Sequence, residues 1–176
     1  KVRIMSTLDI NNIGEFLAHA HALEAEAASQ YADLAEQMEV HNNTEVAELF
    51  HKLAEIEGKH ITKIDDKAGD TPIPHIAPWE YKWEGGQSPE AVVDMEAHYM
   101  MTPHHALTMS LKAEERAADF FQRIADNTTD EQVRSLSTEM ALEEREHIEW
   151  LHKWLEKYPK PEHDWDEDMD PPMLQE

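Results

Sequence analysis

The stretch Glu57-Gly58-Lys59-His60 and its later counterpart Glu144-Arg145-Glu146-His147 decide the fold of this chain. Each places a Glu and a His three residues apart, which brings both side chains to one face of a helix. A single Glu precedes each stretch, Glu24 before the first and Glu114 before the second. Two single glutamates and two Glu-x-x-His pairs, each on its own helix, are the ligand set of a carboxylate-bridged dinuclear metal site inside a helical bundle.

The sequence around these motifs predicts four long amphipathic helices, because apolar residues recur there at three- and four-residue steps. The first two are expected over about residues 12–39 and 45–65, and Asp9 or Asn11 is expected to cap the first. The third is expected to open at Thr102-Pro103 and to end near residue 126. Thr128 and Glu131 form a capping box that predicts the start of the fourth, which should run to about residue 157.

The segment between the second and third helices, about residues 66–102, is rich in Pro and Gly and predicts a long crossover. Within it, Ser88-Pro89-Glu90 is typical of the first turn of a short helix that would end near residue 100. The chain therefore predicts an all-α four-helix bundle made of two hairpins, one domain over residues 1–160. Residues 161–176 form an acidic, proline-rich tail.

Composition excludes several classes of site. The 176 residues contain no Cys, which excludes a disulfide framework, an iron–sulfur cluster, a thiolate zinc site and a cysteine nucleophile. The 38 acidic and 15 basic residues give a net charge of -23, which argues against nucleic acid as a partner. No apolar run approaches membrane-spanning length and the chain does not start with a signal-peptide pattern, so we expect a soluble cytoplasmic protein.

The chain contains two further Glu-x-x-His pairs, Glu48 with His51 and Glu149 with His152. At about 100° per residue, Glu48 is rotated roughly 180° from Glu57 around the helix. Glu149 is rotated roughly 140° from Glu144 by the same count. Because apolar residues surround Glu57 and Glu144, those two are expected to face the core and the additional pairs to face solvent.

The predicted ligands also lie at a common depth, since those of each hairpin fall within roughly one helical turn of each other. The predicted set is Glu24, Glu57, His60, Glu114, Glu144 and His147. Carboxylates are hard ligands that bridge two cations, and one imidazole completes each ion, which suits two iron ions with manganese or zinc as alternatives. Glu57 and Glu144 are the expected bridges, and a one-residue shift to Glu115 or Glu143 is the main alternative.

Tyr31 follows Glu24 on the first helix, as Phe121 follows Glu114 on the third. Its hydroxyl is a candidate to orient a ligand carboxylate or to relay an electron, with a plain aromatic core position as the alternative. Phe121 carries no hydroxyl, so the two halves of the site are expected to differ.

At these residues the chain resembles the ferritin-like superfamily and, within it, the rubrerythrin-type diiron proteins. The matching stretches are Leu23 to Tyr31, Ala54 to His60, Ala113 to Phe121 and Glu143 to Ile148. The resemblance covers roughly residues 12–157. It implies a left-handed bundle with a dinuclear iron centre that oxidises ferrous iron, handles iron or reduces peroxide. The chain departs from rubrerythrins proper in two ways: it has no cysteine-bearing rubredoxin domain, and Leu111 stands where they carry an additional Glu.

The leading hypothesis is a diiron oxidoreductase that oxidises ferrous iron with oxygen or peroxide, with an electron donor that the sequence does not identify. Alternatives are a diiron hydroxylase of organic substrates, a dimanganese catalase, and a non-catalytic metal-binding or partner-docking bundle that presents its acidic tail. The large amphipathic side chains of Trp79, Tyr81 and Trp83 in the crossover predict a homodimer.

Overall fold

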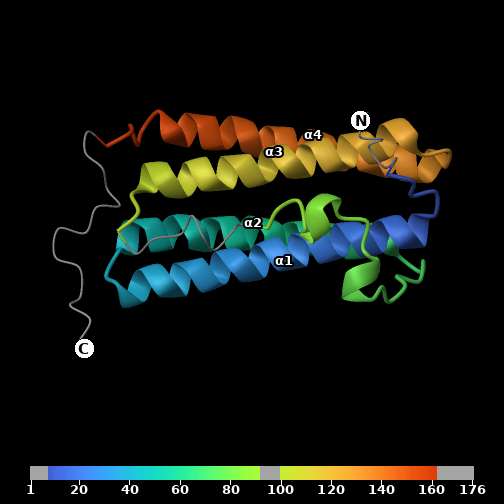
Figure 1. Cartoon of the computed structure of the whole chain (residues 1–176), viewed down its shortest axis with the longest axis horizontal. Helices are drawn as coiled ribbons and strands as arrows, with labels where there is room; N and C mark the ends of the chain where they lie inside the picture. The colour runs from blue at the N-terminus through green and yellow to red at the C-terminus, as the bar shows by residue number, and fades with distance from the viewer. Residues whose placement is uncertain (1–7, 92–99, 162–176) are drawn as a thin grey trace, which may run out of the picture.

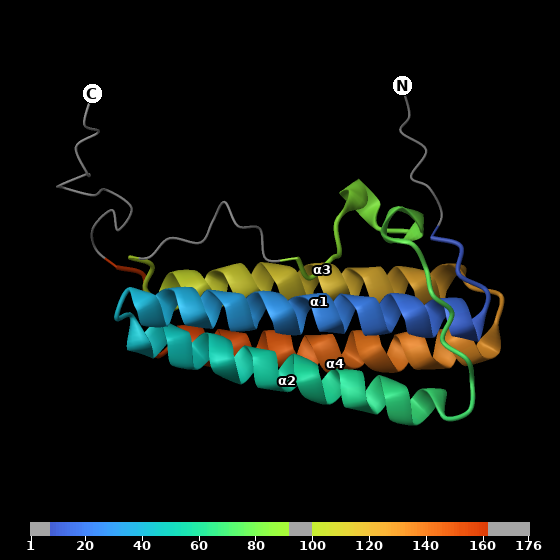
Figure 2. The ribbon, with the colours of Figure 1, turned by 90° about the horizontal axis from the view of Figure 1, so that it is seen from below.

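The computed structural model describes residues 8–91 and 100–161. It contains four long helices, α1 (Ile13–Val40), α2 (Thr44–Ala68), α3 (Pro103–Asn127) and α4 (Glu131–Leu155) (Figure 1). Helices α1 and α2 form one hairpin and α3 and α4 the other, and the two hairpins lie against each other along their length (Figure 2). The predicted all-α four-helix fold is therefore confirmed. None of the helices in the described ranges is long and apolar enough to cross a membrane.

The hydrophobic core consists of two clusters separated along the bundle. The first lies toward the α1–α2 turn and includes Leu34, Phe50 and Leu107. The second lies toward the α3–α4 turn and includes Phe16 and Phe121, whose rings pack edge to face with centroids 6.2 Å apart. The ligand-bearing turns of the four helices lie between these clusters, so apolar side chains enclose that level of the bundle from both ends.

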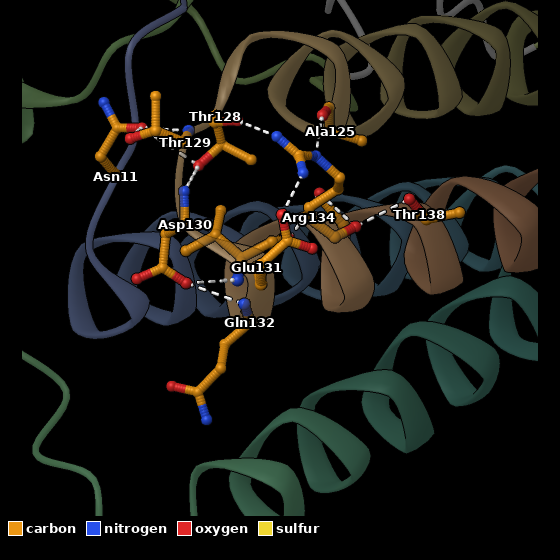
Figure 3. A network of polar contacts seen from close by, with 11 residues as sticks. Asn11, Ala125, Thr128, Thr129, Asp130, Glu131, Gln132, Arg134 and Thr138 are labelled. Carbon is orange, nitrogen blue, oxygen red and sulfur yellow. Dashed lines mark hydrogen bonds and ion pairs between the residues drawn. The ribbon is translucent and has the colours of Figure 1, made fainter.

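The helix starts differ from the predicted caps. Asn12, rather than Asp9 or Asn11, caps α1, and its side chain accepts a hydrogen bond from the backbone of Glu15 at 3.0 Å. Asp130 caps α4 by accepting hydrogen bonds from the backbone N–H groups of Gln132 and Val133 (Figure 3). The capping box predicted between Thr128 and Glu131 is therefore wrong.

Thr128 and Asn11 have another role, because they connect the chain before α1 to the α3–α4 turn. The side-chain oxygen of Asn11 accepts hydrogen bonds from the Thr128 hydroxyl at 3.2 Å and from the backbone of Thr129 at 2.6 Å (Figure 3). Arg134 donates to the carbonyl of Thr128 at 2.6 Å from the first turn of α4. These contacts hold the α3–α4 turn against the residues that precede α1.

The crossover after α2 contains two 3₁₀ turns, η1 (Pro78–Glu80) and η2 (Glu84–Gly86). Buried His19 of α1 holds the segment between them: it accepts a hydrogen bond from the backbone of Lys82 at 3.0 Å, and burial lowers its pKa. Tyr81 and Trp83 stack with ring centroids 5.0 Å apart, and Trp83 also lies 5.3 Å from Phe120. Part of the aromatic surface expected to be free for an interface is thus packed against the chain itself.

Trp79 remains 84% exposed. Beyond it, Ser88 to Ala91 form a turn in which the Ala91 N–H donates to the Ser88 carbonyl at 3.0 Å. The short helix predicted to follow lies largely in residues 92–99, and all but the first residue of the predicted tail lies in residues 162–176. Both stretches are outside the described residues.

Candidate metal centre

All six side chains predicted as metal ligands meet at the level between the two apolar clusters. The four carboxylates are at most 1% exposed, and the side chains of His147 and His60 are 8% and 13% exposed. Each of the first and third helices contributes one Glu, and each of the second and fourth contributes a Glu and a His: Glu24, Glu114, Glu57 with His60, and Glu144 with His147.

Two overlapping groups of ligand atoms are each compact enough to surround one metal ion. Glu24, Glu57 and His60 offer one ligand atom each within 4.8 Å of one another, and so do Glu57, Glu114 and His147. Glu57 belongs to both groups. Glu144 lies within the same limit of His60 and His147. The geometry therefore places the carboxylates of Glu57 and Glu144 within reach of both halves of the site.

Each imidazole contacts the single Glu of its own hairpin. Nδ1 of His60 lies 3.2 Å from Oε2 of Glu24, and Nδ1 of His147 lies 3.3 Å from Oε2 of Glu114. Each hairpin thus supplies two carboxylates and one imidazole, and the two hairpins supply them in the same relative positions.

The electrostatics of this cluster fit bound cations. Burial, followed by the charge of Glu144, raises the pKa of Glu24 well above its usual range. Burial also raises the pKa of Glu114, and burial with the charge of Glu57 raises the pKa of Glu144 to about 7. Oε1 of Glu24 and both carboxylate oxygens of Glu57 and Glu144 have no hydrogen-bond partner among the described residues.

An unpartnered buried polar atom costs about 1–3 kcal/mol, and a charged one costs more. Four neighbouring carboxylates, three of them with oxygens that lack a partner, and two imidazoles would be strongly destabilising as an ionised protein core. Two divalent cations would balance four negative charges and occupy the free oxygen positions. The donor set, oxygen with one nitrogen per ion, is one that iron and manganese accept.

Tyr31 lies in this layer next to the carboxylates. It is 1% exposed, its ring stacks on Phe50 with centroids 6.0 Å apart, and its hydroxyl has no hydrogen-bond partner among the described residues. Burial and then the charges of Glu114 and Glu57 raise the pKa of Tyr31 well above its usual range. Phe121, its counterpart on α3, packs into the apolar cluster, so a hydroxyl is present in one half only.

The other Glu-x-x-His pairs lie outside the centre, as predicted. Glu48, His51, Glu149 and His152 are all exposed. The neighbours considered as alternative ligands also lie outside. Glu115 is exposed, and half-buried Glu143 forms an ion pair with Lys63. Along each helix, the residues predicted as ligands are therefore the ones that point into the core, and the neighbouring alternatives do not.

One buried carboxylate of the centre was missed by the sequence analysis. Glu90, from the crossover, is 2% exposed and has a ligand atom within 4.8 Å of those of Glu24 and Glu144. Burial and then the charge of Glu24 raise its pKa well above the usual range. Ser88-Pro89-Glu90 resembled a helix start, and no periodicity indicated that the side chain of Glu90 points inward. Leu111 of α3, at the position of the additional family Glu, packs against the first apolar cluster instead.

Comparisons with known proteins agree with this architecture. The chain matches the rubrerythrin family over residues 15–76 and 105–170. It is also similar to an uncharacterized conserved protein from Magnetospirillum magnetotacticum MS-1 whose crystal structure is known, with 38% sequence identity and a TM-score of 0.67. That match covers 87% of this chain and 99% of the other. Among curated proteins, no relative matches the chain.

Proposed function

Because this chain belongs to the rubrerythrin family, we propose that it is a dinuclear iron protein that oxidises ferrous iron with oxygen or peroxide. The observation that carries the proposal is the pair of ligand groups that share Glu57, together with the free carboxylate oxygens around them. Two iron ions that share carboxylates supply two electrons together to an O–O bond. With hydrogen peroxide, two electrons and two protons give two water molecules.

Each side chain of the centre has its own role in the proposed reaction. Glu57 and Glu144 would hold both ions, and their second oxygens would allow them to change binding mode as the ionic charge rises. Glu24 with His60 would complete one half of the site, and Glu114 with His147 the other half. The hydroxyl of Tyr31, near Glu57, Glu114 and the side chain of Ser110, would orient a carboxylate or pass an electron on one side of the centre.

The space around the ligands favours small reactants over organic substrates. A cavity of about 10 Å³ borders Glu57, Glu114 and His147, and a second of about 10 Å³ borders His60. Each is close to the minimum for a single water molecule. Oxygen and peroxide need no more than a small channel, whereas a hydroxylase requires a pocket for its substrate. Within the part of the chain that the structure describes, the cavities that border these ligands therefore fit oxygen or peroxide better than an organic substrate, which supports iron oxidation.

The experiment is stopped-flow mixing of the ferrous protein with oxygen and, separately, with hydrogen peroxide. We expect oxidation faster than that of free ferrous iron, and loss of this advantage in Glu57→Ala and Glu144→Ala. Glu48→Ala and Glu149→Ala are matched controls, because each removes an exposed Glu from a Glu-x-x-His pair. Oxidation of the wild-type protein at the rate of iron in buffer would instead support a non-catalytic metal-binding bundle.

A further inference from the structure

Among the described residues, Glu90 is the one acidic side chain at the metal centre that does not come from a long helix. It belongs to the crossover, between η2 and α3. Its carboxylate lies within 4.8 Å of ligand atoms from Glu24 and Glu144, which places it on the α1 side of the centre. It is as deeply buried as the helical ligands, at 2% exposure.

Neither oxygen of Glu90 has a hydrogen-bond partner among the described residues. A buried carboxyl kept for structural reasons would be expected to bond to a backbone N–H, a hydroxyl or a cationic side chain. The ligand atoms grouped with it within 4.8 Å belong instead to the carboxylates of Glu24 and Glu144, which repel it when it is ionised. A cation between Glu90, Glu24 and Glu144 would turn this repulsion into attraction.

The backbone on both sides of Glu90 is held by Arg116, an α3 residue two positions after Glu114. The guanidinium donates to the carbonyl of Pro89 at 2.7 Å and to the carbonyl of Ala91 at 2.9 Å. The helix that carries one metal ligand therefore also fixes the position of the loop that carries Glu90. Such support is typical of groups that orient a ligand from outside the site.

We propose that Glu90 is a fifth carboxylate ligand of the centre, bound to the metal ion on the Glu24 side and positioned by Arg116. The proposal rests on the metal binding proposed above. It makes the two metal positions unequal, since the Glu24 side gains a ligand that the Glu114 side lacks. Four carboxylates balance the charge of two divalent ions, so the negative charge of the fifth stabilises the oxidised, more positive centre.

The test is a titration of the metal-free protein with Co²⁺, followed by calorimetry and by the visible absorption of the bound ion. Glu90→Gln keeps the shape of the side chain and removes its charge. We expect one ion to bind with wild-type affinity and the other at least about tenfold more weakly, with a changed absorption band. Glu115→Gln, an exposed neighbour of Glu114, is the matched control and should bind both ions as the wild type does.

Arg116→Gln separates positioning from general stability. We expect it to weaken the same ion in the wild-type background and to have no further effect on Co²⁺ binding when combined with Glu90→Gln. A folded Glu90→Gln protein with wild-type affinities and absorption would overturn the proposal and leave the proposed function intact. A wild-type protein that oxidises iron slowly, but loses Co²⁺ affinity through Glu90→Gln, would reject only the proposed function. Failure of the wild type to bind Co²⁺ or iron would reject both.

Discussion

The imidazole rings of His60 and His147 stack on each other, with centroids 4.6 Å apart and planes 9° from parallel. One ring comes from each hairpin, and each Nδ1 is directed to a carboxylate of its own hairpin. Burial lowers the pKa of His60, but the hydrogen bond and the negative charge of Glu57 outweigh burial and raise that pKa overall in the metal-free protein. The stacking places the two halves of the centre directly next to each other.

The first prediction separates the two metal positions. Glu24→Ala and Glu114→Ala should each lower the stoichiometry from two bound Fe²⁺ to one, because each residue belongs to only one of the two groups that share Glu57. Glu57→Ala should abolish or severely weaken both, since Glu57 belongs to both groups. Metal analysis after equilibrium dialysis measures this, with Glu48→Ala as the control. Two ions bound to Glu57→Ala would contradict the shared-ligand geometry.

The second prediction concerns Tyr31. Tyr31→Phe should change the free energy of unfolding of the metal-free protein by less than about 1 kcal/mol, because the removed hydroxyl has no partner among the described residues. It should slow iron oxidation about tenfold, as the loss of a group that orients a ligand does. Chemical denaturation and stopped-flow absorbance measure the two effects, and Tyr81→Phe is the control outside the centre. An unchanged oxidation rate would assign Tyr31 to the aromatic core alone.

The third prediction concerns the pH dependence of the stability of the metal-free protein. The pKa values of Glu24, Glu114 and Glu144 are raised in the folded protein, so the folded state binds more protons than the unfolded state. The stability of the metal-free protein should therefore fall as pH rises from about 4.5 through about 7, the window of Glu144. Differential scanning calorimetry at pH 5 and pH 7.5 measures this.

Metal-loaded protein should show the opposite trend, since cations bind the ionised carboxylates and stabilise the folded state more as pH rises. Glu144→Gln should reduce the slope of the metal-free protein, because a neutral amide does not titrate. Equal stability of the metal-free protein at both pH values would show that its carboxylates are solvated.

The fourth prediction is that the chain forms a homodimer. Two of the three crossover aromatic residues pack against their own chain, so the prediction now depends on Trp79, which is 84% exposed. Analytical ultracentrifugation should give a dimer for the wild type and a shift toward monomer for Trp79→Ser. Val40→Ser, which removes another exposed apolar side chain, should not shift the equilibrium. A wild-type protein that is only monomeric at micromolar concentration would reject this prediction.

Most of the fold and of the ligand cluster could be predicted from the sequence, because both follow from helical periodicity. Glu57 and His60 had to share a face, and the apolar residues around them determined which face is buried. The same reasoning placed Glu48 outside. Reasoning from helical periodicity failed for Glu90, because Glu90 lies in an irregular loop. Its burial follows from long-range contacts with α1 and α4, which the sequence pattern does not indicate.

The capping residue of α4 shows a different limit. Thr128 and Glu131 have the spacing of a capping box, yet Asp130 lies one residue before the helix and accepts two backbone hydrogen bonds. The hydroxyl of Thr128 instead donates a hydrogen bond to the side chain of Asn11, which is distant in sequence. The local sequence offers more than one possible N-cap for α4, and a tertiary contact determines which residue takes that position.

The division of the helices into two hairpins also bears on the order in which the molecule assembles. Each hairpin is built from contacts close in sequence, which form fast during folding. The group of Glu24, Glu57 and His60 lies within the first hairpin, whereas the other group combines Glu57 of the first hairpin with Glu114 and His147 of the second. We therefore expect the group with Glu114 and His147 to form only when the hairpins dock, and a metal-free chain must bring these carboxylates together with no cation between them. With the metal binding proposed above, metal supply would then control how quickly newly made chains reach their compact form.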